Sequence, residues 1–311
     1  TSFVAEQWRV FNSSRRMIPN SDGIENASTE TRNEKTYISN GTSACPKKTG
    51  KNKFRLMRVL ITNDDGVASE GLWALARSVV EAGHDAVVAA PTSDMTGMGG
   101  AIGGDLQGGE LRAKRIQRGD LGATECWAVE GPPALCVVMT QLGAFGDPVS
   151  MVVSGVNPGL NCGRSALHSG TVGAALTAAN NGAHGIAVSV DVTGGLMCWD
   201  SAVHIVPELI DRLNSIEKGR RVVNINVPNL PLADIAGLQI ADLAKWGDAA
   251  GLLTAKDGQS WSFQRQPGDP KRRIPGTDNA VVRDGFISMS ELVGIRTQKS
   301  DLDLSDMSLR D

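Results

Sequence analysis

The sequence has few cysteines, few aromatic residues and no long apolar run, and each of these absences excludes a class of protein. The five cysteines among 311 residues are odd in number and form no Cys-x-x-Cys pair. This argues against a disulfide scaffold or a zinc site and favours a reducing compartment, the cytoplasm. No run of about 18 apolar residues occurs, so the sequence predicts no membrane-spanning helix. Aromatic residues make up only 4%, whereas 36 glycines indicate tight turns and close backbone contacts.

The sequence also lacks an excess of positive charge. Its 31 Lys and Arg residues face 34 Asp and Glu residues, which gives a net charge of −3. Proteins that hold a nucleic-acid polymer normally carry a stripe of Lys and Arg against its phosphates. The charge balance therefore excludes polymeric nucleic acid as the main ligand.

The composition changes near residue 56. Residues 1–56 carry ten Lys or Arg and five Asp or Glu, are rich in Ser, Thr and Asn, and follow neither a helical nor a strand period. Such a segment cannot bury enough apolar surface to offset the entropy lost on ordering. We therefore expect residues 1–56 to be a disordered leader, or an extension of the gene model that precedes a natural start at Met57.

From Met57 onward, apolar runs of strand type alternate with segments of helical period. Strands are expected at 57–62, 85–90, 126–129, 150–154, 186–190 and 222–227, and helices at 71–82, 133–142, 169–181 and 203–213. This alternation predicts an α/β fold with a doubly wound, Rossmann-like, mostly parallel sheet, whose site lies at the carboxyl ends of the strands. Residues 57–228 would form this catalytic core. The less regular residues 229–311 are expected to form a hairpin and a C-terminal oligomerisation segment.

Two acidic residues, Asp64 and Asp65, follow the first expected strand. Neighbouring side chains of a strand point to opposite faces, so both carboxylates reach one point only if the backbone turns, which Gly66 permits. Adjacent like charges repel unless a cation neutralises them, and oxygen ligands select a hard divalent ion such as Mg²⁺ or Mn²⁺. The alternative is an Asx-rich turn in which Asp65 or Ser69 caps the next helix.

Two further loops at strand ends offer neutral oxygens. Asn157 follows the strand expected at 150–154, and Thr96 lies in the loop after the strand at 85–90. Alone, each is an ordinary turn or loop residue. In a doubly wound sheet, however, loops at the carboxyl ends of strands meet over one crevice, which favours a shared site.

The segment Ser169-Gly-Thr-Val-Gly173 opens a helix rich in small residues. Backbone N–H groups and hydroxyls at a helix N-terminus suit a phosphate anion. Equally, Ser169 is a standard N-cap and the glycines allow close packing on the sheet. His168 beside this segment could contact a substrate, although a loop histidine is more often solvated.

Seven segments together resemble the SurE survival-protein family of metal-dependent nucleotidases, in the right order from residue 57 to about residue 295. The segments are MRVLITNDDG, APTSDMTG, VEGPPALCV, VVSGVNPG, HSGTVGAA, NINVP and TDNAVVRDGFIS. The resemblance implies a cytoplasmic acid phosphatase that acts on nucleoside 5′- and 3′-monophosphates. It further implies one divalent metal ion, Mg²⁺ or Mn²⁺, and assembly as a homodimer or homotetramer.

The resemblance also implies roles for individual residues. Asp64 and Asp65 would be the catalytic residues. The implied metal ligands are Asp64, Asp65, Thr96 and Asn157, and the implied phosphate contacts are Asn63, Ser169, Gly170 and Thr171. The family commonly has serine where this chain has Thr96, whose additional methyl group stiffens the side chain and crowds an ion.

Two other functions remain open from the sequence alone. A nucleotide-sugar glycosyltransferase would explain a glycine-capped helix before a second strand, but it leaves the pair Asp64 and Asp65 unexplained. A non-catalytic nucleotide-binding module would follow if the Thr96 loop no longer held an ion. Metal-dependent release of phosphate distinguishes the three functions.

Overall fold

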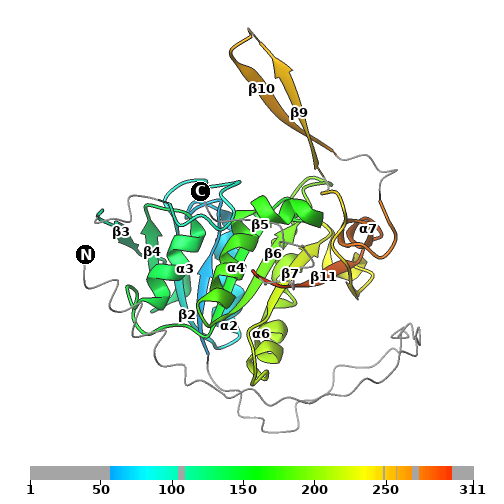
Figure 1. Ribbon diagram of the computed structural model, residues 1–311. Helices are drawn as coiled ribbons and strands as arrows, with labels where there is room; N and C mark the ends of the chain where they lie inside the picture. The colour runs from blue at the N-terminus through cyan, green and yellow to red at the C-terminus, as the bar shows by residue number, and fades with distance from the viewer. Residues whose placement is uncertain (1–56, 104–108, 248, 257, 268–272, 296–311) are drawn as a thin grey trace, which may run out of the picture. The chain divides into compact units, whose positions relative to one another are not determined.

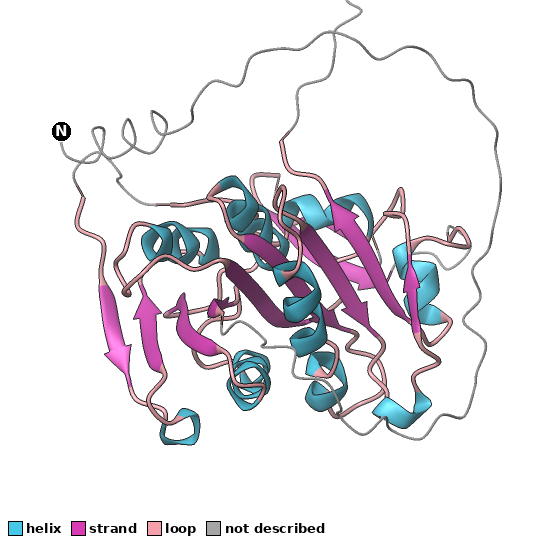
Figure 2. Ribbon diagram, turned by 90° about the horizontal axis from the view of Figure 1, so that it is seen from below, coloured by secondary structure: helices cyan, strands magenta, loops and turns pink. Residues whose placement is uncertain are grey.

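The computed structural model describes residues 57–103, 109–247, 249–256, 258–267 and 273–295. The leader expected over residues 1–56 lies outside them. The described residues form a nine-stranded sheet covered by helices on both faces, and a separate two-stranded hairpin (Figures 1 and 2). In this part of the chain no helix is both long and apolar enough to cross a membrane.

The large sheet is parallel through its centre. Its strands run in the order β3-β4-β2-β1-β5-β6-β7-β11-β8. Their bounds are β1 Arg58–Thr62, β2 Asp85–Pro91, β3 Ala113–Ile116, β4 Glu125–Val129, β5 Met151–Pro158, β6 His184–Val190, β7 Val222–Val227, β8 Leu238–Ile240 and β11 Ile287–Leu292. The strands from β4 to β7 in this order pair in parallel, whereas β3 and β11 are antiparallel to their neighbours β4 and β7. The predicted doubly wound, mostly parallel sheet is therefore confirmed.

Helices cover both faces because the central strands are apolar on both sides. In β1, Val59 and Ile61 face one apolar cluster and Leu60 faces the other. Helices α2, α5 and α6 pack on the first face, and α3 and α4 on the second (Figure 1). Their bounds are α2 Glu70–Glu81, α3 Pro133–Gln141, α4 Gly170–Asn180, α5 Trp199–Val203 and α6 Val206–Asn214.

Some expected elements differ from those observed. The helix expected over 203–213 is observed as α6, and only Val203 of this range belongs to the shorter helix α5 before it. The break is at Pro207, which has no N–H for a helix interior and lies in the first turn of α6. The strand expected to end at residue 154 continues to Pro158 after a register shift between Ser154 and Asn157. Asn157 therefore lies at the end of a strand and not in a free loop.

The C-terminal segment is less separate than the sequence predicted. Strands β8 and β11 extend the main sheet, and α7 (Asp278–Arg283) packs beside β11. Strand β11 has an alternating pattern, in which Ile287 and Met289 face the apolar cluster and Ser288 and Ser290 face the opposite side. Strands β9 (Ala249–Ala255) and β10 (Trp261–Pro267) form a separate antiparallel hairpin. A domain boundary after residue 228 stays a prediction.

The sheet order places a crevice at the carboxyl ends of β1 and β5. From β1 the chain proceeds outward through β2 and β4, and from β5 it proceeds the opposite way through β6 and β7. The connections therefore diverge between β1 and β5, which is the usual ligand position in doubly wound sheets. The Asp64 turn follows β1, and Asn157 ends β5.

Candidate functional site

The turn after β1 is held by Asn63. Its buried side chain donates from Nδ2 to the carbonyl oxygen of Gly66 at 3.2 Å and accepts from the Gly66 N–H at 3.1 Å. Gly66 has a φ of 88°, and a Cβ there would lie 3.0 Å from the carbonyl carbon of Ser93. Asn63, and not Asp65 or Ser69, therefore makes the Asx-type turn here, and its contact with phosphate stays a prediction. Ser69 is at the N-cap position of α2 but makes no side-chain capping bond.

The Asp64 carboxylate is buried against the first turn of α4. It is only 2% exposed, and Oδ1 accepts a hydrogen bond from the Thr171 hydroxyl at 2.5 Å. Burial raises the pKa of Asp64, and hydrogen bonds from Thr171 and from the backbone of Gly170 oppose this increase. A Cβ on Gly170 would lie 2.7 Å from the Asp64 Cβ, so the close approach requires glycine. The helix N-terminus thus stabilises the Asp64 anion directly.

The Asp65 carboxylate is partly buried beside two other carboxylates. Burial, followed by repulsion from Asp64 and Asp94, raises the pKa of Asp65 to about 7. Its Oδ2 atom is buried and has no hydrogen-bond partner among the described residues. An unpartnered carboxylate oxygen beside like charges fits a cation ligand, because a cation would neutralise the repulsion and satisfy the oxygen.

The loop that carries Thr96 lies against the Asp64 turn. The N–H of Met95 donates to the backbone oxygen of Asp64 at 2.7 Å. Within the loop, the Thr96 hydroxyl and N–H both donate to Oδ1 of Asp94, at 2.6 and 2.8 Å. The hydroxyl oxygen keeps its lone pairs and can still bind a cation.

Asn157 reaches the same edge of the sheet from β5. Thr62 of β1 pairs with Ser154 of β5, and Asn157 follows three residues later on that strand. Its Nδ2 atom donates to the carbonyl oxygen of Gly159 at 2.6 Å. This bond orients the amide group and leaves its oxygen as the atom able to bind a cation.

The N-terminus of α4 lies against both the Asp64 carboxylate and the loop that carries Thr96. Ser169 is confirmed as the N-cap, because its Oγ accepts from the N–H of Val172 at 3.2 Å. The N–H of Gly99 donates to the oxygen of His168 at 3.2 Å, and a Cβ on Gly173 would lie 2.2 Å from the oxygen of Gly99. The Thr96 loop is therefore packed directly on the start of α4. His168 itself is exposed, and its contact with a substrate stays a prediction.

Comparison with known proteins assigns the family. A family model described as survival protein SurE matches residues 59–249. The chain belongs to the SurE family. Curated relatives include "5′-nucleotidase SurE" of Dehalococcoides mccartyi, 37% identical over 247 residues that cover 76% of this chain and 88% of the relative. Another is "5′-nucleotidase SurE" of Histophilus somni, 32% identical over 239 residues that cover 76% and 92%.

A solved structure confirms the SurE fold. The crystal structure of SurE protein from Aquifex aeolicus superposes with a TM-score of 0.63 and is 24% identical in sequence. The match covers 76% of this chain and 92% of that one. The resemblance inferred from the seven sequence segments is therefore confirmed.

Sequence reasoning missed two polar residues around this SurE site. Asp94 contacts Thr96 and raises the pKa of Asp65. Asn161 fixes the chain after β5, since its Nδ2 donates to Ser189 at 2.9 Å and its backbone N–H donates to Oδ1 of Asn226 at 2.8 Å. The signal for Asn161 was present, because Asn224 and Asn226 are polar residues on one face of an otherwise buried strand.

The donor set fits a hard divalent cation. The predicted ligands are Asp64 and Asp65 after β1, Asn157 at the end of β5 and Thr96 in the loop after β2, and their binding of one ion stays a prediction. In the described part of the chain no three His, Cys, Asp or Glu side chains are grouped to hold a metal ion. A cation here would therefore complete its coordination with neutral oxygens, water or substrate, as Mg²⁺ commonly does.

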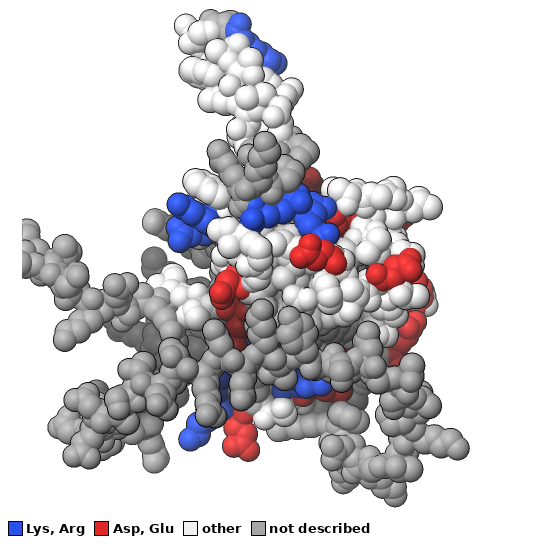
Figure 3. All heavy atoms as spheres, turned by 90° about the vertical axis from the view of Figure 1, so that its right-hand side faces the viewer, with Lys and Arg blue, Asp and Glu red and all other residues white. Residues whose placement is uncertain are grey.

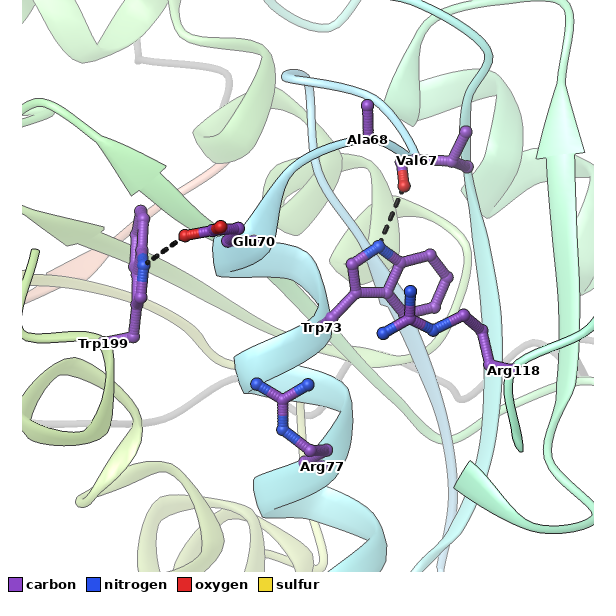
Figure 4. A pocket seen from close by; sticks show the side chains of 7 residues that line it. All are labelled: Val67, Ala68, Glu70, Trp73, Arg77, Arg118 and Trp199. Atoms are coloured by element: carbon purple, nitrogen blue, oxygen red, sulfur yellow. Dashed lines mark hydrogen bonds between the residues drawn. The ribbon is translucent and has the colours of Figure 1, made fainter. Parts of the chain in front are cut away.

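A pocket of about 450 Å³ lies beside α2 (Figure 4). It is lined by Val67, Ala68, Glu70, Trp73, Arg77, Arg118 and Trp199. Trp73 donates to the oxygen of Val67 at 2.9 Å and Trp199 donates to Glu70 at 3.4 Å, whereas Arg77 and Arg118 bind Asp120 outside the lining. The Arg118 guanidinium lies 4.3 Å from the centre of the Trp73 ring. The pocket contains none of the predicted site residues.

Exchange of Thr96 tests whether its oxygen binds the cation. We expect Thr96→Ser to keep or improve Mn²⁺ affinity, because serine keeps the oxygen and removes the crowding methyl group. Thr96→Val removes the oxygen and should weaken Mn²⁺ binding about fivefold, since water can replace a neutral ligand. Calorimetric Mn²⁺ titration measures both.

Thr92→Val is the matched control for the Thr96 variants. Thr92 is exposed at the start of the same loop, so the same chemical change there should leave Mn²⁺ affinity unchanged. Titrations of Thr96→Val that superimpose on the parent would show that Thr96 is an ordinary loop residue.

Proposed function

We propose that this chain is a metal-dependent phosphohydrolase that removes phosphate from nucleoside 5′-monophosphates, and also from 3′-monophosphates. Its curated SurE relatives carry the name 5′-nucleotidase. The observation that carries the proposal is the buried, unpartnered Oδ2 of Asp65 beside Asp64, at the N-terminus of α4. This arrangement suits a divalent cation, Mg²⁺ or Mn²⁺, next to a phosphate.

The residues of the chain bind and orient the substrate in this proposal. In the proposal the phosphate lies beside Ser169, Gly170 and Thr171 at the first turn of α4, where the helix dipole favours an anion. Thr171 also holds Asp64 in position through its 2.5 Å hydrogen bond. A divalent cation held by Asp64, Asp65, Thr96 and Asn157 would polarise the phosphoryl group and lower the pKa of a bound water.

The distribution of charge favours a small substrate. Figure 3 shows Lys and Arg side chains beneath the hairpin with Asp and Glu side chains next to them. This face therefore carries both signs of charge instead of a continuous basic stripe. A mononucleotide agrees with this pattern better than a nucleic-acid polymer does.

Phosphate release from nucleotides tests the proposed function. We expect the full chain to release inorganic phosphate from 5′-AMP and 3′-AMP in the presence of Mn²⁺ or Mg²⁺, and to stop when EDTA is added. Binding of 5′-AMP without release in either metal would instead indicate a non-catalytic nucleotide-binding module. Transfer of sugar from a nucleotide sugar, without hydrolysis of 5′-AMP, would indicate a glycosyltransferase.

We further propose a homodimer or homotetramer assembled through the β9–β10 hairpin. Leu253 pairs with Phe263, and Trp261 lies two residues before Phe263 on the same face of β10. These side chains are 62%, 66% and 57% exposed, respectively. A two-stranded hairpin is marginally stable alone, so an uncovered apolar face favours burial against a second copy of the chain.

The double variant Leu253→Ser with Phe263→Ser tests this assembly. We expect the parent to have the mass of a dimer or tetramer in light scattering at micromolar concentration, and the variant to have a smaller mass. Leu252→Ser is the matched control, because Leu252 lies on the opposite face of β9 and pairs with Gln264. A monomeric parent would contradict the proposal.

A further inference from the structure

The chain that carries the hairpin leaves and returns beside the loop between β5 and α4. It leaves after Ala244 and returns at Asp278, the first residue of α7. The N–H of Gly163 donates to Oδ2 of Asp278 at 2.7 Å, and the N–H of Arg164 donates to the oxygen of Ala244 at 3.1 Å. Both bonds hold the start of η2, the short 3₁₀ helix Gly163–His168.

The start of η2 and residues 242–247 are so closely packed that a Cβ added at either contact would clash. A Cβ on Gly163, whose φ is 63°, would lie 2.6 Å from the oxygen of Trp246 and 2.8 Å from that of Ala244. A Cβ on Gly247 would lie 2.1 Å from the Ser165 hydroxyl oxygen. The start of η2 and residues 242–247, which we call the hairpin base, are therefore packed backbone to backbone.

The carboxylate of Asp278 joins the start of η2 to the hairpin base. Its side chain is fully buried, and besides Gly163 it accepts hydrogen bonds at Oδ1 from the N–H groups of Ala244 at 3.0 Å and Asn279 at 2.8 Å. Its own N–H donates to the oxygen of Asp242 at 2.9 Å. A buried carboxylate held by several N–H groups is a strong and geometrically specific contact.

The position of Gly163 determines where α4 begins, because η2 connects the two. Gly163 is the first residue of η2, and Ser169, the N-cap of α4, directly follows its last residue; Ala166 of η2 is buried. The N–H of Ser169 donates to the oxygen of Ala166 at 3.1 Å, which ties η2 to the helix start. Thr171, two residues after Ser169, holds the Asp64 carboxylate.

We infer that Asp278 is a positioning residue for the phosphate site: through Gly163 and η2 it holds the first turn of α4 against Asp64. The inference rests on the function proposed above. The side chain of Asp278 accepts hydrogen bonds from Gly163, Ala244 and Asn279, and the bond from Gly163 is the one that leads to α4. The C-terminal segment is then part of the framework of the site.

Asp278→Asn tests the inference in the full chain. Asparagine keeps the volume but replaces one acceptor oxygen by an NH₂ group, which cannot accept the N–H of Gly163 or Ala244. We expect the Kd for inorganic phosphate, measured calorimetrically with saturating Mn²⁺, to rise at least about tenfold. The KM for 5′-AMP should rise in parallel, whereas kcat should fall less.

Ser290→Ala is the matched control for a merely structural effect. It removes a buried 2.8 Å bond from Ser290 to the oxygen of Ala241, in the same C-terminal segment, without touching Gly163. We expect it to lower the melting temperature and leave phosphate affinity unchanged. Equal loss of phosphate affinity in both variants, or none in Asp278→Asn, would overturn the inference. Failure of the parent itself to bind phosphate would instead refute the proposed function.

Gly163→Ala provides a second variant if Asp278→Asn does not fold. It keeps the Asp278 carboxylate but forces η2 away from the hairpin base, because its Cβ meets the oxygen of Trp246. We expect the same rise in phosphate Kd. A folded Gly163→Ala protein that binds phosphate as the parent does would show that α4 is positioned independently of this contact.

Discussion

Asp64→Asn is expected to reduce metal-dependent phosphate release by roughly a thousandfold while the protein remains folded. The substitution removes one of two adjacent carboxylates that face the crevice between β1 and β5. Asparagine keeps the shape of the side chain, and its oxygen can still accept the hydrogen bond from Thr171. Steady-state release of phosphate from 5′-AMP at saturating Mn²⁺ measures the loss, and a thermal melt measures stability.

Asp120→Asn is the matched control for this variant. Asp120 is an exposed carboxylate that binds Arg118 and Arg77, so the same chemical change there should leave turnover unchanged. Asp64→Asn removes repulsion between Asp64 and Asp65 but also an oxygen that accepts backbone N–H bonds from α4, so the thermal melt must show that the variant is folded. Turnover close to that of the parent would refute the role of Asp64.

The convergence of the candidate site residues could be predicted because it depends on topology. Alternating strands and helices predict a doubly wound sheet, and in such a sheet the carboxyl ends of strands share one edge. Asp64 and Asp65 follow β1, and Asn157 ends β5, which is its direct neighbour in the sheet. A strand pattern and one general rule were therefore enough to bring these residues together.

The partner of each polar atom could not be predicted, because it depends on contacts between residues far apart in the chain. Thr171, expected as a phosphate contact, donates its hydroxyl to Asp64, a residue 107 positions away. Asp278 was part of a recognised segment, yet its bond to Gly163 spans 115 positions. Spacing in the sequence carries no information about such pairs.

The hairpin of the C-terminal segment was expected, but the addition of β8 and β11 to the main sheet was missed for a different reason. Strand β8 has only three residues, Leu238–Ile240, which is too short for a period to be recognised. Strand β11 alternates well, but Ser288 and Ser290 are buried, so its polar face does not indicate solvent as an alternating pattern normally would. On that buried polar face, Ser290 donates a hydrogen bond to the oxygen of Ala241, the residue immediately before the hairpin base.

Gly173→Ala is expected to lower both activity and stability, although alanine favours a helix over glycine. A Cβ at Gly173 would lie 2.2 Å from the oxygen of Gly99 and 2.3 Å from its carbonyl carbon, both backbone atoms that cannot rotate away. Either the Thr96 loop or the start of α4 must therefore move. We expect phosphate release to fall at least about tenfold and the melting temperature to fall by roughly 5 °C, the usual scale of overpacking in a domain of this size.

Gly100→Ala is the matched control, because it replaces a glycine of the same loop without a clash like that between Gly173 and Gly99. Gly100 is the next residue of the same loop, is exposed, and would have no atom within 4 Å of an added Cβ. We expect its melting temperature and phosphate release to match the parent. In a helix free of the contact, glycine to alanine would stabilise the protein by about 0.5–1 kcal/mol. A Gly173→Ala protein with a raised melting temperature and unchanged activity would therefore show that the Thr96 loop is not held on α4, and that Thr96 and Asp64 are not parts of one site.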